Sequence, residues 1–217
     1  MNAFTRHEIT AITPKRRVVS WCRAFDGGSL TRYQPILDAA TGLIAAYWSV
    51  ARKTSEHSLS AQIELHIENT PPDKPLVLTL DHHQFMDEEH ATDNAVLQVL
   101  QQHLWADVEL IVCLQHAADE ALLCMETYKR LQKAGIPTMV DAHAPWDLPS
   151  INTLVDANTL KFEPSQLPAS LEQLLGLARE MGIRTLLTEV KSRTQAAWAA
   201  RKGFDWLLGP VQQARIF

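Results

Sequence analysis

The stretch "YQPILDAATGLIAAYWSVAR" (33–52) contains two apolar runs separated by a short connection that includes Gly42. Short apolar runs bounded by glycine, proline or charge are typical of strands that are covered on both faces. We therefore predict strands over 31–38 and 43–52. Six later runs have the same character, and they are predicted as strands over 75–81, 108–114, 136–142, 157–163, 183–190 and 204–209.

Amphipathic helical patterns lie between several of these runs. Apolar residues recur at spacings of three and four, which places them on one face of a helix that covers a core. Two such stripes are Ala121, Cys124, Tyr128 and Leu131, and Leu171, Leu174, Leu175, Ala178 and Met181.

Three junctions join a helix to a strand in the same way. The segments before Gly135, Gly182 and Gly203 each close with a basic or long polar residue, and each glycine precedes a new apolar run. Glycine at this place is typical of a helix end that needs a left-handed residue. Eight strands with such connections favour a closed barrel in one domain. The phosphate-binding patterns GxGxxG and GxxxxGK, which are typical of open sheets, are absent from the sequence.

The bulk composition restricts the class of protein. The chain has 217 residues, 46% hydrophobic composition and a net charge of −5, with 20 basic and 25 acidic residues. This charge argues against a nucleic-acid-binding surface. No apolar stretch of about 18 residues predicts a membrane span, and the basic start lacks the apolar run of a signal peptide. Cys22, Cys113 and Cys124 have no metal-ligand spacing and are expected to be reduced thiols in the cytoplasm.

The order of motifs resembles the EAL domains, the cyclic di-GMP phosphodiesterases of bacteria. "YQPILDAATGLIAAYWSVAR" is similar to their YQPI strand, D-x-x-T-G turn and Glu-Ala-Leu strand. "LVLTLDHHQF", "LQKAGIPTMVDAH", "TLKFE", "LLTEVKSRTQ" and "GFDWLLGP" follow in the family's order, to the C-terminus. The resemblance implies an α/β fold, a modified TIM (β/α)8 barrel of the EAL type whose first strand is antiparallel to the rest. It also divides the chain into an N-terminal arm or helix packed on the barrel (1–29) and the barrel itself (30–217).

The family's chemistry uses two divalent cations held by carboxylates and one Asn at the carboxyl ends of the strands. In this sequence most of those positions carry other residues. The ligand positions fall on Trp48, Thr79, Cys113, His116 and Thr188, with Lys191 and Leu208 in place of a second Glu and a Gln. Because indole, hydroxyl and thiol groups replace oxygen anions, we predict a catalytically inactive barrel that needs no metal and no cofactor.

A few of the family's residues remain. Asp141 and Lys161 are vestiges of the catalytic set, and Glu163 is a conservative replacement. We expect Lys161 to be a structural cation paired with Asp141 or Glu163, because a buried ammonium needs an anion. If the chain binds a ligand, the retained residues for it are Gln34, Pro35 and Arg52. Arg52 matches a phosphate group in a forked geometry.

The stretch "LTLDHHQFMDEEH" (78–90) raises an enzymatic alternative. Asp81, His82 and His83 resemble the manganese ligands of another phosphoesterase family. Those sites also need a D-x-D pair on an earlier strand, and no such pair lies upstream. We instead expect a solvated helix entrance, with the acidic residues of "MDEEH" near the helix start, where they favour its dipole.

Three functional hypotheses follow. The first is a regulatory protein in bacterial signalling that acts by protein–protein interaction, through outer helices or the loop around 142–149 with Trp146. The second is a receptor that binds cyclic di-GMP without cleaving it. The third is a metal-dependent phosphoesterase that uses the Asp81–His82–His83 stretch. The protein partner is unidentified, no nucleic acid or membrane partner is expected, and the resemblance also allows a homodimer.

Overall fold

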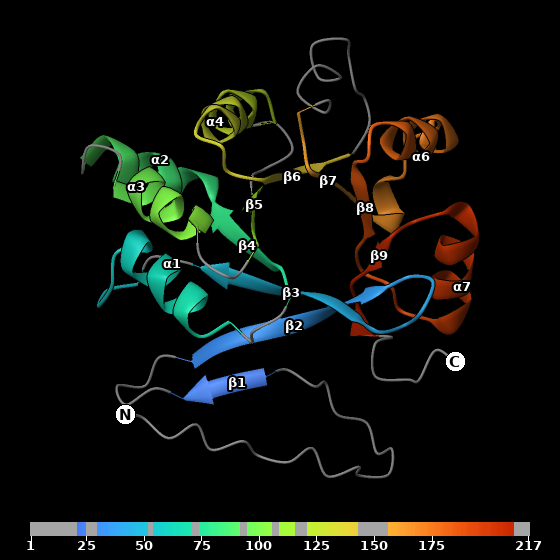
Figure 1. The fold of residues 1–217 in the computed structure, drawn as a ribbon, viewed down its shortest axis with the longest axis horizontal. Helices are drawn as coiled ribbons and strands as arrows, with labels where there is room; N and C mark the ends of the chain where they lie inside the picture. The colour runs from blue at the N-terminus through green and yellow to red at the C-terminus, as the bar shows by residue number, and fades with distance from the viewer. Residues whose placement is uncertain are drawn as a thin grey trace.

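The computed structural model describes residues 21–24, 30–51, 54–70, 74–91, 95–105, 109–115, 121–142 and 156–210. Nine strands and several helices follow one another along these ranges (Figure 1). The strands are β1 (Trp21–Ala24), β2 (Leu30–Asp38), β3 (Ile44–Ala51), β4 (Leu76–Asp81), β5 (Leu110–Gln115), β6 (Thr138–Asp141), β7 (Thr159–Phe162), β8 (Arg184–Leu187) and β9 (Trp206–Leu207). The helices are α1 (Leu59–Glu68), α2 (His82–Ala91), α3 (Ala95–Gln102), η1 (His103–Trp105), α4 (Ala121–Lys133), η3 (Pro164–Gln166), α6 (Leu171–Glu180) and α7 (Arg193–Lys202).

The sheet closes on itself. Its strands are ordered from β1 to β9 along the sheet, and an additional pairing of β2 with β9 completes the barrel. β2 is antiparallel to both β3 and β9, whereas the pairings from β3 to β9 are parallel. β2 to β9 therefore form an eight-stranded barrel with its first strand reversed. This confirms the predicted EAL-type TIM barrel.

All eight predicted strands are present, with ends that differ from the prediction by at most a few residues. The sequence analysis missed β1, which pairs with β2 in antiparallel register from Trp21↔Tyr33 to Ala24↔Leu30. The rest of the predicted arm, 1–20 and 25–29, lies outside the described residues. The division at residue 29 therefore stays a prediction.

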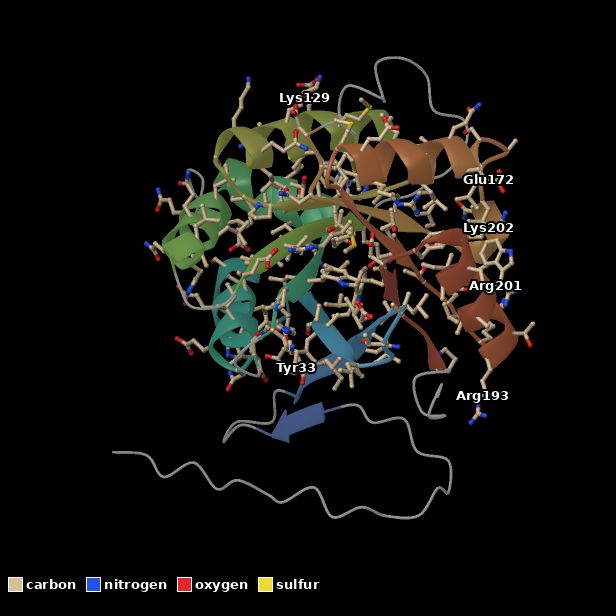
Figure 2. The ribbon with its side chains drawn as sticks, turned by 45° about the vertical axis from the view of Figure 1, so that its right-hand side comes forward. Tyr33, Lys129, Glu172, Arg193, Arg201 and Lys202 are labelled. Atoms are coloured by element: carbon tan, nitrogen blue, oxygen red, sulfur yellow. The ribbon has the colours of Figure 1, made fainter. Side chains whose placement is uncertain are left out.

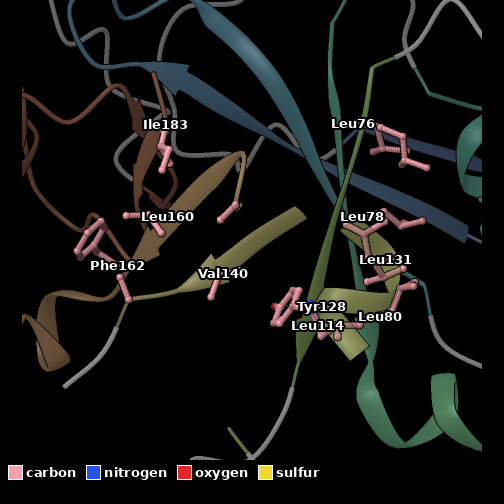
Figure 3. Close-up of a cluster of buried hydrophobic side chains, with 14 of the residues drawn as sticks. Leu76, Leu78, Leu80, Leu114, Tyr128, Leu131, Val140, Leu160, Phe162 and Ile183 are labelled. Carbon is pink, nitrogen blue, oxygen red and sulfur yellow. The ribbon is translucent and has the colours of Figure 1, made fainter. Parts of the chain in front are cut away.

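Side chains from the strands form two separate apolar layers. One layer joins the outer faces of the strands to the helices, and Figure 3 shows part of it, where Leu78, Leu80 and Leu114 meet Tyr128 and Leu131 of α4. The other layer is smaller and contains residues of seven barrel strands, together with Leu208, which directly follows β9. Its members are Ile36, Ala46, Val77, Ile111, Cys113, Met139, Leu186, Trp206 and Leu208. Because side chains alternate across a strand, this second set fills the barrel interior.

The predicted helix stripes are buried where the structure describes their side chains. In α4 the buried members are Cys124, Tyr128 and Leu131. In α6 they are Leu171, Leu174, Leu175 and Ala178. Met181 was wrongly included in the second stripe, because α6 ends before it and its side chain is 39% exposed. No helix among the described residues is long and apolar enough to cross a membrane.

Left-handed glycines end the helices as predicted. Gly135, Gly182 and Gly203 have φ angles of 78°, 70° and 90°. A side chain at such a φ is strained, so glycine is the residue that lets the chain turn from α4, α6 and α7 into the next strand.

A carboxylate from α2 holds the start of α1. Glu88 is 4% exposed, and its oxygens accept hydrogen bonds from the backbone N–H groups of Leu59 and Ser60 at 2.7 and 3.0 Å. The Ser60 hydroxyl donates a third bond at 2.7 Å. The first N–H groups of a helix have no partner within the helix, and the helix dipole favours an anion there. Glu88 thus fixes α1 against α2 on the outside of the barrel.

A buried histidine fixes the other end of α1 to the barrel. The Nδ1 atom of His66 lies 2.7 Å from the Ser49 hydroxyl of β3. The carbonyl oxygen of His66 accepts hydrogen bonds from the hydroxyls of Tyr33 on β2, at 2.6 Å, and Thr70, at 2.7 Å. Burial lowers the pKa of His66 from 6.5 to about 4, so its ring is neutral near pH 7.

We expect this histidine to make the stability depend on pH. A histidine with a depressed pKa binds more protons in the unfolded chain than in the folded one, so the free energy of unfolding falls as pH drops from about 6.5 towards 4. The full loss is on the order of 3 kcal/mol. Urea unfolding at a series of pH values would measure it.

The variant His66→Gln keeps a side chain that can bond to Ser49 but removes the titration, so it should flatten this part of the profile. The variant His57→Gln, at an exposed histidine, is the matched control and should keep the slope. An unchanged slope in His66→Gln would show that other groups cause the dependence.

Candidate functional site: the carboxyl-terminal mouth of the barrel

The carboxyl ends of the parallel strands meet at one end of the barrel, which is where TIM-barrel enzymes place their chemistry. The positions singled out by the sequence analysis lie there. Trp48 is on β3, Thr79 on β4, Cys113 on β5, Asp141 on β6 and Lys161 on β7, while Thr188 and Leu208 directly follow β8 and β9. Trp48, Thr79, Asp141 and Thr188 each lie two residues from a member of the interior layer, and Cys113 and Leu208 belong to it. Lys161 stands opposite Asp141 in the β6–β7 register, so all of these side chains share the inner face.

An ion pair occupies the mouth. The Nζ atom of Lys161 lies 2.6 Å from Asp141 Oδ1, and the two side chains are only 13% and 17% exposed. The two residues stand opposite each other in the β6–β7 register. The pairing of Lys161 predicted from the sequence is therefore present, with Asp141 as its partner.

The indole of Trp48 packs beside this ion pair. The Lys161 ammonium lies 5.9 Å from the centroid of the Trp48 ring, within the range of a cation–π contact. Trp48 is partly buried and packs on the interior apolar layer. The large ring thus fills space beside the cation and supplies no oxygen ligand.

Thr79 and Cys113 stand side by side on the neighbouring strands β4 and β5. Both are buried, and burial raises the pKa of the Cys113 thiol, although the charge of Lys161 and the Tyr128 hydroxyl offset part of this effect. A neutral thiol is a poor ligand for a hard cation, because such ions bind through oxygen.

The segment after β8 places a hydroxyl at the mouth, at the position where the resemblance expects a carboxylate. Thr188 is buried, and its hydroxyl donates to the carbonyl oxygen of Phe162 on β7 at 3.1 Å. The next residue, Glu189, is exposed and has a φ angle of 51°. That left-handed conformation is the one a glycine adopts most readily, so it agrees with the expected alignment of Glu189 with the glycine of the A-E-G-V-E motif and of Thr188 with its first Glu. Glu189 pairs instead with Lys191, at 3.3 Å.

The remaining predicted residues are only partly brought together. Gln34 stands opposite Trp48 in the β2–β3 register, whereas Pro35 lies on the other face of β2.

Leu208 is buried in the interior layer. Glu163 directly follows β7 and is the residue before η3, and it accepts a bond from Gln166 at 3.4 Å. Arg52, His116 and Trp146 lie outside the described residues.

The Asp81–His82–His83 stretch forms the start of α2. Asp81 Oδ1 accepts a hydrogen bond from the backbone N–H of Gln84 at 3.0 Å, which caps the helix. The predicted solvated entrance is wrong for His82, which is 5% exposed with its Nε2 atom 3.1 Å from the Thr127 hydroxyl of α4. The prediction for the acidic residues is also wrong, because the first turn of α2 contains none.

In the ranges that the structure describes, no three His, Cys, Asp or Glu side chains gather closely enough to hold a metal ion. The sequence analysis also missed the role of Tyr128, whose hydroxyl accepts a hydrogen bond from the Leu114 backbone N–H at 3.0 Å. The pairing of β5 with β6 ends at Cys113, so this bond gives the N–H group of the next residue a partner. A tyrosine within an otherwise aliphatic stripe was the available signal, since a buried hydroxyl needs a partner.

No protein-family model matches this sequence, and no curated protein matches it either. Solved structures do match. The YkuI protein of Bacillus subtilis, with an EAL domain in complex with cyclic di-GMP and calcium, has a TM-score of 0.59 and 17% identity, covering 82% of this chain and 53% of that one.

Two other structures agree with this match. The PaMucR phosphodiesterase, in complex with cyclic di-GMP, has a TM-score of 0.57 and 16% identity over 85% of this chain and 90% of that one. An EAL domain protein from Listeria monocytogenes EGD-e has a TM-score of 0.54 and 11% identity over 82% and 85%. This chain spans about half of the Bacillus subtilis protein and most of the other two. The likeness shows that the barrel has the EAL-type fold.

We expect the Asp141–Lys161 pair to be strongly coupled. Removing one partner leaves the other charge poorly compensated, so Lys161→Met and Asp141→Leu should each lower the free energy of unfolding by roughly 3 kcal/mol. The double variant should lose about 2 kcal/mol less than the sum. The exposed pair Lys129–Glu126 is the control, and its coupling should stay below about 0.5 kcal/mol. Additive losses at Asp141 and Lys161 in urea unfolding would contradict the coupling.

We also expect Glu189→Gly to stabilise the protein. Relief of the left-handed strain should raise the free energy of unfolding by about 1 kcal/mol, and the exposed ion pair with Lys191 that it removes contributes little. Glu189→Ala removes the same carboxylate but keeps a Cβ, so it should bring no gain. Equal stability of the two variants in thermal unfolding would show that the φ angle is not strained.

Proposed function

We propose that this chain is a catalytically inactive EAL-fold barrel that acts as a regulatory protein in bacterial cyclic di-GMP signalling, through association with another protein. The observation that carries the proposal is the occupant of the mouth. Beside the retained ion pair of Lys161 and Asp141, at 2.6 Å, lies the ring of Trp48, which stands where the resemblance expects a ligand carboxylate and supplies no oxygen.

The chemistry of the donor groups supports inactivity. Magnesium and similar ions require several oxygen ligands that converge on one point, and Mg²⁺ has strict geometric demands. Here the inner face offers a thiol at Cys113, a hydroxyl at Thr188 and an aliphatic side chain at Leu208. Of the expected carboxylate ligands only Asp141 is retained, and it is paired with Lys161. Metal-activated water, which such a phosphodiesterase needs, therefore has no adequate set of ligands among these side chains.

The regulatory role is argued from the fold. The Bacillus subtilis and PaMucR structures were solved with cyclic di-GMP, which supports the same signalling context for this chain. One fold can carry different functions, and a barrel whose interior no longer supports chemistry still presents its outer helices and loops to other proteins. Association is the function that such a molecule retains.

A turnover assay tests the proposal. The purified chain, incubated with cyclic di-GMP and Mg²⁺ or Mn²⁺, should release no linear product, while the PaMucR phosphodiesterase in the same assay serves as the active control. Metal-dependent hydrolysis that Asp141→Asn abolishes would overturn the inactive assignment.

Titration calorimetry with cyclic di-GMP, with and without Mg²⁺, separates the regulatory protein from a ligand receptor. We expect no heat of binding, because Trp48 and the ion pair fill the mouth. Saturable binding that is lost in both Gln34→Ala and Arg52→Ala would instead favour the receptor.

A further inference from the structure

A hollow of about 660 Å³ lies at the opposite end of the barrel from the mouth. Its walls are the last turns of α4, the turn 135–137 before β6, and the residues just before β7. The polar side chains that line it are Lys129, Gln132, Lys133, Asp156 and Asn158, and we call it the α4–β7 hollow. We propose that this hollow binds an extended acidic peptide segment of the protein partner. The inference rests on the proposed function, because it supplies the partner's docking site.

The charges of the hollow favour a carboxylate. Lys129 and Lys133 are one helical turn apart and project from the same side of α4, and Figure 2 shows Lys129 on its outer side. Within the described ranges Lys133 makes no ion pair, and Lys129 has only an exposed pair with Glu126 at 3.0 Å. Such a pair is worth less than about 1 kcal/mol, so an incoming carboxylate can replace it.

The amide groups favour a peptide main chain. The Asn158 Oδ1 atom accepts the Thr138 backbone N–H at 2.9 Å, and Gln132 Nε2 donates to the Thr138 hydroxyl at 3.2 Å. These bonds fix both amides and leave an N–H donor on Asn158 and a carbonyl acceptor on Gln132. A peptide group offers the complementary acceptor and donor. Because both amides are held in place beforehand, binding does not have to order these two side chains.

The apolar part of the hollow and its remaining charge argue against a nucleotide. Pro137 is partly buried over the fully buried Ile136 and provides a small aliphatic surface for a peptide side chain. No aromatic ring among the described residues lines the hollow, whereas nucleobases bind by stacking on such rings. The carboxylate of Asp156 would also repel a phosphate dianion more strongly than a single carboxylate.

Fluorescence anisotropy with two labelled peptides tests the proposal. One is an extended peptide of alternating Glu and Leu, and the other has Gln in place of Glu. The wild-type chain should bind the Glu peptide saturably and more tightly than the Gln peptide. Its affinity for the Glu peptide should fall severalfold as the salt concentration rises from about 50 to 200 mM. Absence of saturable binding to the Glu peptide would overturn the proposal.

Charge variants locate the site. The double variant K129E/K133E should weaken binding by about tenfold or more, and the neutral variant K129Q/K133Q should weaken it by a smaller factor. In K129E/K133E the new carboxylate at position 129 could unfold α4 by repelling Glu126. The neutral variant avoids this repulsion and still tests the site. The control R193E/R201E makes the same change of charge on α7, on a different side of the barrel (Figure 2), and should bind like the wild type. Equal weakening by the control would show a non-specific charge effect.

A short labelled oligonucleotide is the alternative probe. If K129E/K133E weakened binding of the oligonucleotide but left binding of the Glu peptide unchanged, the peptide assignment would be overturned. The result is separate from the turnover assay. Peptide binding can fail while the chain remains inactive towards cyclic di-GMP, and hydrolysis would reject the proposed function whatever the peptide does.

Discussion

The ion pair between Asp141 and Lys161 sets the character of the barrel's mouth. A carboxylate on the inner face of a barrel needs a positive charge nearby, and either a metal ion or an ammonium can supply it. Here the ammonium lies 2.6 Å away. The Lys161 ammonium balances the charge of the Asp141 carboxylate. A further carboxylate on the inner face would therefore have no positive charge to compensate it. Apolar and neutral side chains such as Trp48, Cys113 and Leu208 can then pack around the pair without electrostatic cost.

The scaffold does not depend on that chemistry. The polar contacts that hold α1 in place, made by Glu88 and His66, lie outside the barrel, and the Tyr128 hydroxyl joins α4 to the end of β5. The interior contributes a separate apolar layer. A change of side chains at the mouth therefore leaves the closure of the sheet and its helical cover intact, which is the physical reason that an EAL-type fold can persist with a different set of residues there.

Local signals predicted most of the fold from the sequence. Strand runs, helix stripes and the glycines at 135, 182 and 203 each depend on residues close together in the chain. The reversed first strand came only from the resemblance, because it depends on closure between β2 and β9. The Asp141–Lys161 pair was predictable because neighbouring strands place both at the same level. β1 was missed because four residues carry too short a pattern. His66 and Glu88 were missed because Ser49 and Leu59, which they contact, lie 17 and 29 residues away in the chain.

The short strand β6 connects the two ends of the barrel. It has four residues, with Thr138 at the amino end and Asp141 at the carboxyl end. Thr138 is hydrogen-bonded to Asn158 and Gln132, and Asp141 is bonded to Lys161 on β7. The walls of the α4–β7 hollow and the filled mouth are therefore anchored on the same rigid pair of strands. A partner that binds the hollow meets strands that the ion pair joins at their other end, so the contacts at the mouth also help to preorganise the surface through which we propose the protein acts.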